Sequence, residues 1–443
     1  MNKIITLIKT HRAITTVLVI GFCAALGYAL YFHIKPSVDA RAYDSIAWSL
    51  VQGTGYTETS SPVHDSAIGR LGPGYEFFLA FWYFIFGHQL WIIWVIQAIL
   101  HVASGFLIYR FIKEFYEGNH RERYAVLGAT FYIFFIDVLE FPAMLLTETL
   151  YIFLVLLGAW FGLKMWRRPN TKNTIFGMFF LVLAVLVRPP AVIVLFLLLG
   201  YLAVRKYFKL VLVGALVAIL VLTPWTIRNY QKYHRFIVTS AILGYDLWVG
   251  NSPDSKHVGE LTATKEIDTY ASSQGLFAAN KKGMSEVIGL IFSDPGSFLK
   301  LQLTKTSIYF SAARPAAFWF HLHGVSQLAT IILSSGFAFV LLIFGLAGLW
   351  LQITKRTKDS WFLILATLAA PAGIIWIVAE TRYRYQMYPF LIILGVLFLA
   401  ELKQNWRAYL KPAAVALLLV FTNTAFDAIR NAPRVLERFN RLF

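Results

Sequence analysis

Residues 326–351 read SQLATIILSSGFAFVLLIFGLAGLWL, a run of 26 residues without a charged side chain. Apolar runs of about 20 residues bounded by charge are typical of transmembrane helices. The sequence holds about 11 such runs, with a range of about 10–13, and it therefore predicts an all-α integral membrane protein. The predicted spans are 13–32, 89–111, 124–139, 145–166, 174–188, 189–204, 209–226, 326–351, 360–379, 386–401 and 412–428.

The composition excludes a soluble enzyme. Hydrophobic residues make up 58% of the 443 residues and charged residues 14%, whereas soluble chains have about 45–50% and about 25%. The single cysteine, Cys23, leaves no disulfide framework and no cysteine-based metal site.

The positive charge predicts the topology. The formal net charge is +17, and with the N-terminus inside, half of the 40 Lys and Arg residues fall in short inner segments. Cytoplasmic loops of membrane proteins carry such an excess of Lys and Arg, so a nucleic-acid partner is not needed to explain the net positive charge. We expect a multi-pass membrane protein with two large extracytoplasmic loops.

This topology divides the chain into six expected segments. They are an N-terminal cytoplasmic segment with the first helix (1–32), a first extracytoplasmic loop with interfacial helices (33–88), transmembrane helices 2–7 (89–226), a large extracytoplasmic loop (227–325), the C-terminal transmembrane helices (326–428) and an amphipathic tail (429–443).

The first outer loop begins with an amphipathic pattern. In DARAYDSIAWSLV (39–51), one helical face carries Tyr43, Ile46, Ala47 and Leu50, which predicts a helix along the membrane surface. Asp39 opens this helix, either as its N-cap or as an acid with a chemical role. Asp44 points away from Asp39 and is expected on a solvated face.

Several motifs follow in order along the outer side of the predicted topology. In the first loop, Asp39 and Tyr43 are followed by Gly53, Gly55-Tyr56, Arg70 and Pro73-Gly74-Tyr75. Later motifs are Thr147–Tyr151, Leu186–Pro189, Pro224–Tyr230, Leu247–Asn251 and Arg382-Tyr383-Arg384. The ordered set resembles the GT-C-type, phospholipid-carrier-dependent membrane glycosyltransferases, related to protein mannosyltransferases and to lipid A aminoarabinose transferases.

The resemblance implies a GT-C-like bundle that moves a monosaccharide from a polyprenyl-phosphate carrier to a hydroxyl of an extracytoplasmic acceptor. The acceptor classes are a glycolipid, lipid A or lipopolysaccharide, a cell-wall glycan, or a protein. Asp39 matches the family's catalytic aspartate, implying a general base and inversion at the anomeric carbon. No nucleotide-binding loop is present in the sequence, which fits a donor that carries its own energy.

Two other functions stay open at this point. One is a polyprenyl-diphosphate-linked glycan ligase or polymerase, and the other is a flippase or transporter of lipid-linked sugars. A transporter predicts internal symmetry and charges at mid-membrane, and the sequence shows neither an internal repeat nor such charges.

A leaving phosphate needs cations, and Arg pairs phosphate oxygens bidentately. Four arginines lie at predicted outer helix ends, where snorkelling at the interface is the alternative. They are Arg188, Arg228, Arg382 and Arg384.

Other expected substrate-binding residues are Tyr43, Arg70 and Tyr383, although Tyr383 fits an aromatic belt at least as well. Glu148 lies just inside a span and is expected in the site, with a structural pair to Arg188 as the alternative. No cofactor is certain; a divalent metal held by Asp39 and Glu148 is an alternative.

Overall fold

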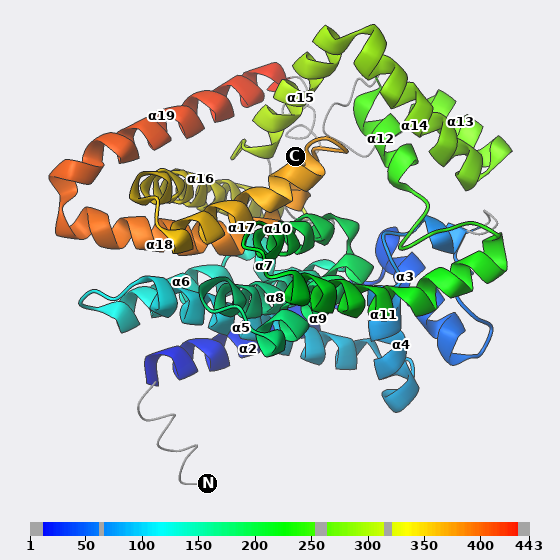
Figure 1. Cartoon of the computed structure of the whole chain (residues 1–443), viewed down its shortest axis with the longest axis horizontal. Helices are drawn as coiled ribbons and strands as arrows, with labels where there is room; N and C mark the ends of the chain where they lie inside the picture. The colour runs from blue at the N-terminus through cyan, green and yellow to red at the C-terminus, as the bar shows by residue number, and fades with distance from the viewer. Residues whose placement is uncertain (1–11, 62–65, 253–263, 314–320, 433–443) are drawn as a thin grey trace.

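The computed structural model describes residues 12–61, 66–252, 264–313 and 321–432. These residues form helices and connecting loops, with no strand among them, which confirms the predicted all-α class. In Figure 1, α2 (Arg12–Phe32), α5 (Leu90–Phe115), α8 (Glu148–Arg167), α9 (Thr171–Val187) and α11 (Phe208–Tyr233) run side by side. The tail expected at 429–443 lies almost wholly outside the described residues.

Every predicted span contains a helix, but the count of eleven is not confirmed. Within the described residues, six helices are long and apolar enough to cross a membrane: α2, α5, α8, α11, α16 (Gly324–Lys355) and α19 (Trp406–Arg430). A seventh candidate is a pair of segments, α6 (Arg121–Ile133) and Ile136–Ala143, which are bent by 60°. The four remaining predicted spans hold shorter helices: α9, α10 (Val192–Val204), α17 (Lys358–Ile374) and α18 (Tyr388–Gln404).

Two helix breaks lie next to each other. The first follows α9, where Pro189 and Pro190 begin a short 3-10 turn, η3 (Pro189–Ala191), because proline disfavours a continuous helix. The second follows α17 and leads into η4 (Thr381–Gln386). Gly373 near the end of α17 faces Pro190, since a Cβ built on Gly373 would lie 3.4 Å from the Cβ of Pro190. The C-terminal ends of α9 and α17, which the sequence predicts to be outer, therefore meet.

The first outer loop packs directly on the first break. A Cβ on Gly72 would lie 2.1 Å from the carbonyl oxygen of Leu186, and one on Gly74 would lie 2.8 Å from the backbone nitrogen of Val187. Only glycine permits this close approach of two backbones. The motif around Gly72 thus fixes the first loop against the segment that carries Arg188.

The outer loops contain the expected surface helix and a second group of helices. The helix α3 (Asp39–Val51) has the predicted bounds, and Tyr43, Ile46 and Ala47 on its predicted apolar face are buried. The helix α4 (Gly74–Phe86) follows it. The large loop folds into α12 (Leu243–Asn251), α13 (Lys265–Gln274), α14 (Leu276–Ser293) and α15 (Pro295–Tyr309), which project above the bundle in Figure 1.

A buried lysine attaches this helical loop to the second break. The Nζ of Lys305 on α15 donates to the Oδ1 of Asn251 at 2.8 Å and to the carbonyl of Trp376 at 3.2 Å. The backbone of α12 contacts the same segment, next to Trp376. A Cβ on Gly250 would lie 1.9 Å from the carbonyl oxygen of Ile377. The loop is therefore held against the residues that connect α17 to η4.

The helix ends predicted to be cytoplasmic contact one another at the other end of the bundle. The guanidinium of Arg167 on α8 lies 2.6 Å from the Glu114 carboxylate on α5 and 2.8 Å from the Asp359 carboxylate on α17. The indole of Trp166 donates to the carbonyl of Lys358. The helix ends predicted to be cytoplasmic thus lie at the opposite end of the bundle from the two helix breaks.

Candidate functional site

Asp39 is the first residue of α3, and its carboxylate is partly exposed. The N-cap is Val38, which has a positive φ of 48° and provides no side-chain cap. The alternative that Asp39 caps the helix is therefore wrong. Its Oδ1 instead accepts a hydrogen bond from the Nη1 of Arg70 at 3.3 Å, and 37% of its side chain is exposed.

Arg70 fixes the position of Asp39. Its Nε donates to the Oε2 of Glu58 at 3.0 Å, while its Nη1 reaches Asp39. Burial alone would lower the pKa of the Arg70 guanidinium, but the hydrogen bond and charge of Glu58 reverse this and raise it. Asp39 thus has a permanent cation on one side and an open side facing a cavity.

Asp44 on the same helix has a different environment. Its Oδ1 accepts a hydrogen bond from the hydroxyl of Tyr83 at 2.7 Å and lies 2.8 Å from the Nε2 of His88. Only 19% of its side chain is exposed, so the expectation of a solvated face is wrong. Asp44 ties α3 to the end of α4 and takes no part in the contacts of Asp39.

Glu148 and two arginines form a buried ionic cluster. The Oε1 of Glu148 lies 3.1 Å from the Nη1 of Arg188 and 3.8 Å from the Nε of Arg382. Arg382 also lies 3.6 Å from Glu380, so two carboxylates balance two guanidinium groups. The predicted pairing of Glu148 with Arg188 is present, and it brings the start of α8 to both helix breaks.

Arg188 retains a hydrogen-bond donor that no described residue satisfies. Its Nη1 donates to Thr147 at 2.9 Å and to Glu148, but its Nε is buried without a partner among the described residues. A buried donor left unpaired costs about 1–3 kcal/mol. This free N–H is therefore available to an anionic or polar ligand.

Two tyrosines of η4 pack beneath Arg188. The guanidinium carbon of Arg188 lies 4.7 Å from the ring centre of Tyr383 and 5.5 Å from that of Tyr385. Both tyrosines are buried, so the expectation that Tyr383 belongs to an aromatic belt is wrong. Their rings lie close enough to the guanidinium for cation–π attraction, which helps to hold Arg188 in place.

The other two predicted arginines lie elsewhere. Arg228 lies over the rings of Trp225 and Tyr56, at 4.9 and 5.4 Å. Arg384 is fully buried and donates to the carbonyl of Ser311. Tyr43 is buried on α3 with its ring 5.5 Å from that of Tyr75. Of the predicted site residues, the structure thus brings together Asp39, Arg70, Glu148, Arg188, Arg382 and Tyr383.

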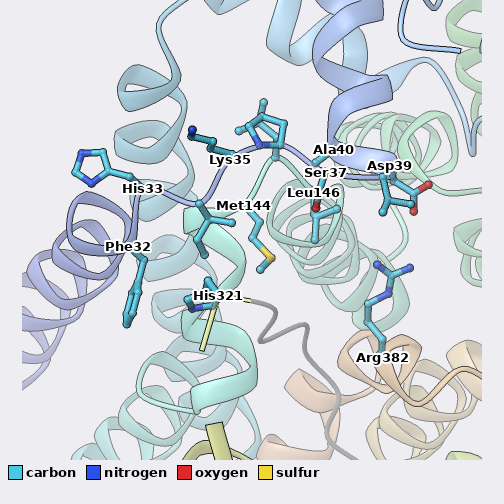
Figure 2. A pocket seen from close by; sticks show the side chains of 14 residues that line it. Phe32, His33, Lys35, Ser37, Asp39, Ala40, Met144, Leu146, His321 and Arg382 are labelled. Carbon is cyan, nitrogen blue, oxygen red and sulfur yellow. The ribbon is translucent and has the colours of Figure 1, made fainter. Parts of the chain in front are cut away.

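Three cavities border this cluster, and the first lies beside the linker between α2 and α3. We name it the linker cavity; it has a volume of about 570 Å³. Figure 2 shows Asp39 and Arg382 facing each other at one end of the cavity, with His33, His321 and Phe32 at the other end. The exposed side of the Asp39 carboxylate therefore faces a space large enough for a substrate.

The second cavity is apolar, and we name it the apolar cavity. It has a volume of about 1250 Å³ between α4 and α11, and α9 forms its floor. Its walls are aromatic and aliphatic, and one arginine borders it. The lining residues include Phe77, Phe78, Phe81, Phe179, Leu183, Leu186, Val187, Val221, Trp225 and Arg228. Leu186 and Val187 in its lining directly precede Arg188 in the chain.

The third cavity lies where the two helix breaks meet, and we name it the break cavity. It has a volume of about 180 Å³, and its polar lining includes Arg188, Thr239, Ser240, Asp246 and Gln386. Burial, followed by the negative charge of Asp39, raises the pKa of Asp246 to about 7, while Arg188 opposes this. The sequence did not mark Asp246 or Gln386 as site residues. Only their positions near the Leu247–Asn251 and Arg382-Tyr383-Arg384 motifs could have indicated them.

The described residues do not offer a preformed metal site. Among them, no three His, Cys, Asp or Glu side chains lie close enough to hold a metal ion. Glu148, one of the two expected ligands, is already paired with Arg188. The residues of the cluster therefore do not fit a metal ion.

The sequence and the fold resemble known proteins. Residues 70–227 match the family described as dolichyl-phosphate-mannose-protein mannosyltransferase. This match includes Arg70, Glu148 and Arg188. No curated protein matches this chain at a significant level.

The fold is similar to that of two solved archaeal structures. An oligosaccharyltransferase of Archaeoglobus fulgidus, in complex with an inhibitory peptide and a dolichol-phosphate, superposes with a TM-score of 0.50 and 14% identity, covering 94% of this chain and 55% of that one. The apo form of an oligosaccharyltransferase of the same organism gives 0.49 and 13%, covering 93% and 55%. This chain thus spans about half the length of these structures. The family match and the fold support a membrane glycosyltransferase of the GT-C type.

Proposed function

We propose that this chain, whose fold and family match are those of a GT-C-type membrane glycosyltransferase, moves a sugar from a polyprenyl-phosphate carrier to an acceptor hydroxyl. The observation that carries this proposal is the position of Asp39. Its carboxylate is held by Arg70, opens into the linker cavity and lies opposite Arg382. The reaction is proposed to take place on the extracytoplasmic face of a bacterial inner membrane, and the six-segment organisation of the chain is proposed with it.

The apolar cavity suits the isoprenoid chain of the donor. Its aromatic and aliphatic walls would take apolar surface out of water or lipid without leaving polar groups unpaired. The lipid phosphate would then lie near Arg188, because Leu186 and Val187 line the cavity immediately before it. The archaeal relative contained a dolichol-phosphate, which is consistent with this placement.

The ionic cluster suits the phosphate itself. Arg188 has an unpaired Nε donor, and its guanidinium carbon lies 4.7 Å from the ring centre of Tyr383. Positioned donors stabilise charge that develops on a leaving group, which is where electrostatic catalysis acts. Arg188 and Arg382 would hold the phosphate as the bond to the sugar breaks, with Glu148 keeping both guanidinium groups in place.

Asp39 would act as the general base. An acceptor hydroxyl in the linker cavity would donate its proton to Asp39 as its oxygen attacks the anomeric carbon. The bond from that carbon to the phosphate oxygen breaks, and the electron pair leaves with the carrier phosphate. Attack from the side opposite to the phosphate inverts the anomeric centre. The proton remains on Asp39, and Arg70 keeps the carboxylate oriented.

The test is single-turnover transfer in nanodiscs with a panel of radiolabelled polyprenyl-phosphate monosaccharides and crude membrane acceptors. Wild-type protein is expected to consume at least one donor, and Asp39→Asn to be about a hundredfold slower or more. Asp44→Asn is the matched control, since Asp44 lies on the same helix but contacts Tyr83 and His88. Its transfer rate should stay close to that of the wild type.

Other outcomes would contradict the proposal. If Asp39→Asn and Asp44→Asn both retain the wild-type rate, Asp39 is not the base. If wild-type protein uses no monophosphate donor but transfers from a diphosphate-linked oligosaccharide, the chain is a glycan ligase. Movement of the lipid across the bilayer without transfer would indicate a flippase.

A further inference from the structure

We propose that the break cavity binds the sugar of the donor. The sugar would be a single uncharged ring whose hydroxyls form hydrogen bonds with Gln386 and Asp246. This proposal rests on the proposed transferase function and specifies its donor. The cavity lies where the breaks after α9 and α17 meet, and Arg188 forms part of its wall. A sugar there would lie beside the group that holds its phosphate.

Gln386 provides an unpaired amide. Its side chain is 5% exposed, and neither its oxygen nor its nitrogen has a hydrogen-bond partner among the described residues. An amide carries two donors and one acceptor group, and leaving them buried and unpaired is costly. Neighbouring hydroxyls of a sugar can both donate and accept, so they satisfy both ends of this amide.

Asp246 provides a strong acceptor from the outer loop. It lies on α12, whose C-terminal residue Asn251 is bonded to Lys305 and to the carbonyl of Trp376. These contacts fix α12 against the second break, so Asp246 is presented by a rigid part of the loop. Its carboxylate can accept hydrogen bonds from one or two sugar hydroxyls.

The charge around the cavity favours a neutral sugar. Arg188 is already paired with Glu148, and Asp39 lies near enough to Asp246 for its charge to help raise the pKa of Asp246. A negatively charged sugar such as a uronate would therefore lie beside the carboxyl groups of Asp39 and Asp246, while Arg188 is taken up by Glu148 and by the phosphate of the same donor. Like charges at close range disfavour such a ligand.

The size of the cavity favours one ring. Its volume of about 180 Å³ is the smallest of the three cavities. That space suits one monosaccharide better than an oligosaccharide. Its walls also contain the apolar residues Leu71, Pro189, Pro190 and Ile377, which can pack on the C–H faces of a sugar ring.

The experiment measures donor discrimination as well as rate. It compares kcat/KM for two polyprenyl-phosphate sugars that differ at a single hydroxyl, in the wild type and in Gln386→Met and Asp246→Asn. Gln386→Met keeps the volume of the side chain and removes its polar atoms. Asp268→Asn is the matched control, because Asp268 lies in the same outer loop on α13 and bonds to Tyr245.

We expect the wild type to prefer one epimer, and at least one of the two variants to lower that preference about tenfold or more, as the loss of a buried hydrogen bond to a charged or unpaired group predicts. Asp268→Asn should keep the wild-type ratio. A merely structural role would lower the rates for both donors equally and leave the ratio unchanged. Because the two variants are independent, either one that folds is sufficient for the test.

Three results would overturn the proposal. Gln386→Met and Asp246→Asn could both keep the wild-type ratio while the wild type transfers, which would remove the sugar site but leave the transferase intact. Faster transfer of a uronate than of a neutral sugar would contradict the charge argument. Absence of transfer from every lipid-linked donor by the wild type would remove the proposed function and the sugar site together.

Discussion

The carboxylate of Glu148 and the guanidinium of Arg188 form an ion pair of 3.1 Å in which both side chains are almost fully buried. Arg382 approaches the same Oε1 atom at 3.8 Å. One carboxylate at the start of α8 thus links the break after α9 to η4. The position of both arginines depends on it.

Glu148→Gln should destabilise the protein strongly. It leaves Arg188 without its ionic partner in a buried site, and breaking such a pair costs about 3–5 kcal/mol. Thermal unfolding in detergent would measure the fall in Tm. The control is Glu401→Gln, which breaks a more exposed pair with Lys355 and should cost less than about 1 kcal/mol. Equal losses in the two variants would contradict the role given to Glu148.

Arg188→Lys and Arg384→Lys should differ in their effects on the kinetic constants for the donor. Lysine keeps the charge of Arg188 but loses its planar fork and its stacking on Tyr383. We expect kcat/KM for the donor to fall about tenfold to a hundredfold, which corresponds to ~1.4–2.8 kcal/mol. Arg384→Lys should lower Tm, because its bond to Ser311 is lost, while folded protein keeps the donor KM. A larger change of donor KM in the Arg384 variant would reverse this assignment.

Gly72→Ala should disturb the site without touching any charged group. The new methyl would lie 2.1 Å from the carbonyl oxygen of Leu186, so the first loop must move away from the break that carries Arg188. Overpacking of this kind costs about 1–3 kcal/mol, and both Tm and the transfer rate should fall. In Gly200→Ala the added methyl meets nothing within 4 Å, so that variant should retain both properties.

The raised pKa of Asp246 predicts a pH dependence of stability. Burial and the charge of Asp39 raise it to about 7, whereas an unfolded aspartate titrates near ~3.9. Between about pH 4 and pH 7 the folded chain therefore holds a proton that the unfolded chain has released, so stability falls as the pH rises. Asp246→Asn removes this contribution. The Tm of the variant minus the Tm of the wild type should therefore increase from pH 5 to pH 8. A Tm difference that does not change with pH would contradict the shift.

The sequence predicted the local features of the site because they depend on local patterns. The bounds of α3 follow from its apolar face, and the break after α9 follows from Pro189 and Pro190. The pair of Glu148 with Arg188 was one of two expected alternatives. These features need only helical periodicity, proline chemistry and the scarcity of charge in a span.

The sequence could not predict which outer residues meet. Arg188, Arg228, Arg382 and Arg384 all lie at helix ends that the sequence predicts to be outer, but the sides of the bundle to which they belong depend on helix packing. Arg228 packs among aromatic rings and Arg384 against Ser311. Asp246 reaches the site only because α12 folds back onto Ile377, a contact between segments more than a hundred residues apart.

The tight contact between Gly250 and the carbonyl of Ile377 has a consequence for access. The loop cannot slide along the second break, since there is no room for even a methyl group between them, and Lys305 bonds to the same stretch of backbone. We therefore expect a long lipid to enter from the side rather than past this loop. The apolar cavity lies between α4 and α11 over α9, and Phe77 and Trp225 in its wall are in ring contact at 6.0 Å. The donor and the released carrier would then diffuse within the plane of the bilayer. The rates of donor binding and carrier release would depend on the fluidity of the surrounding lipid.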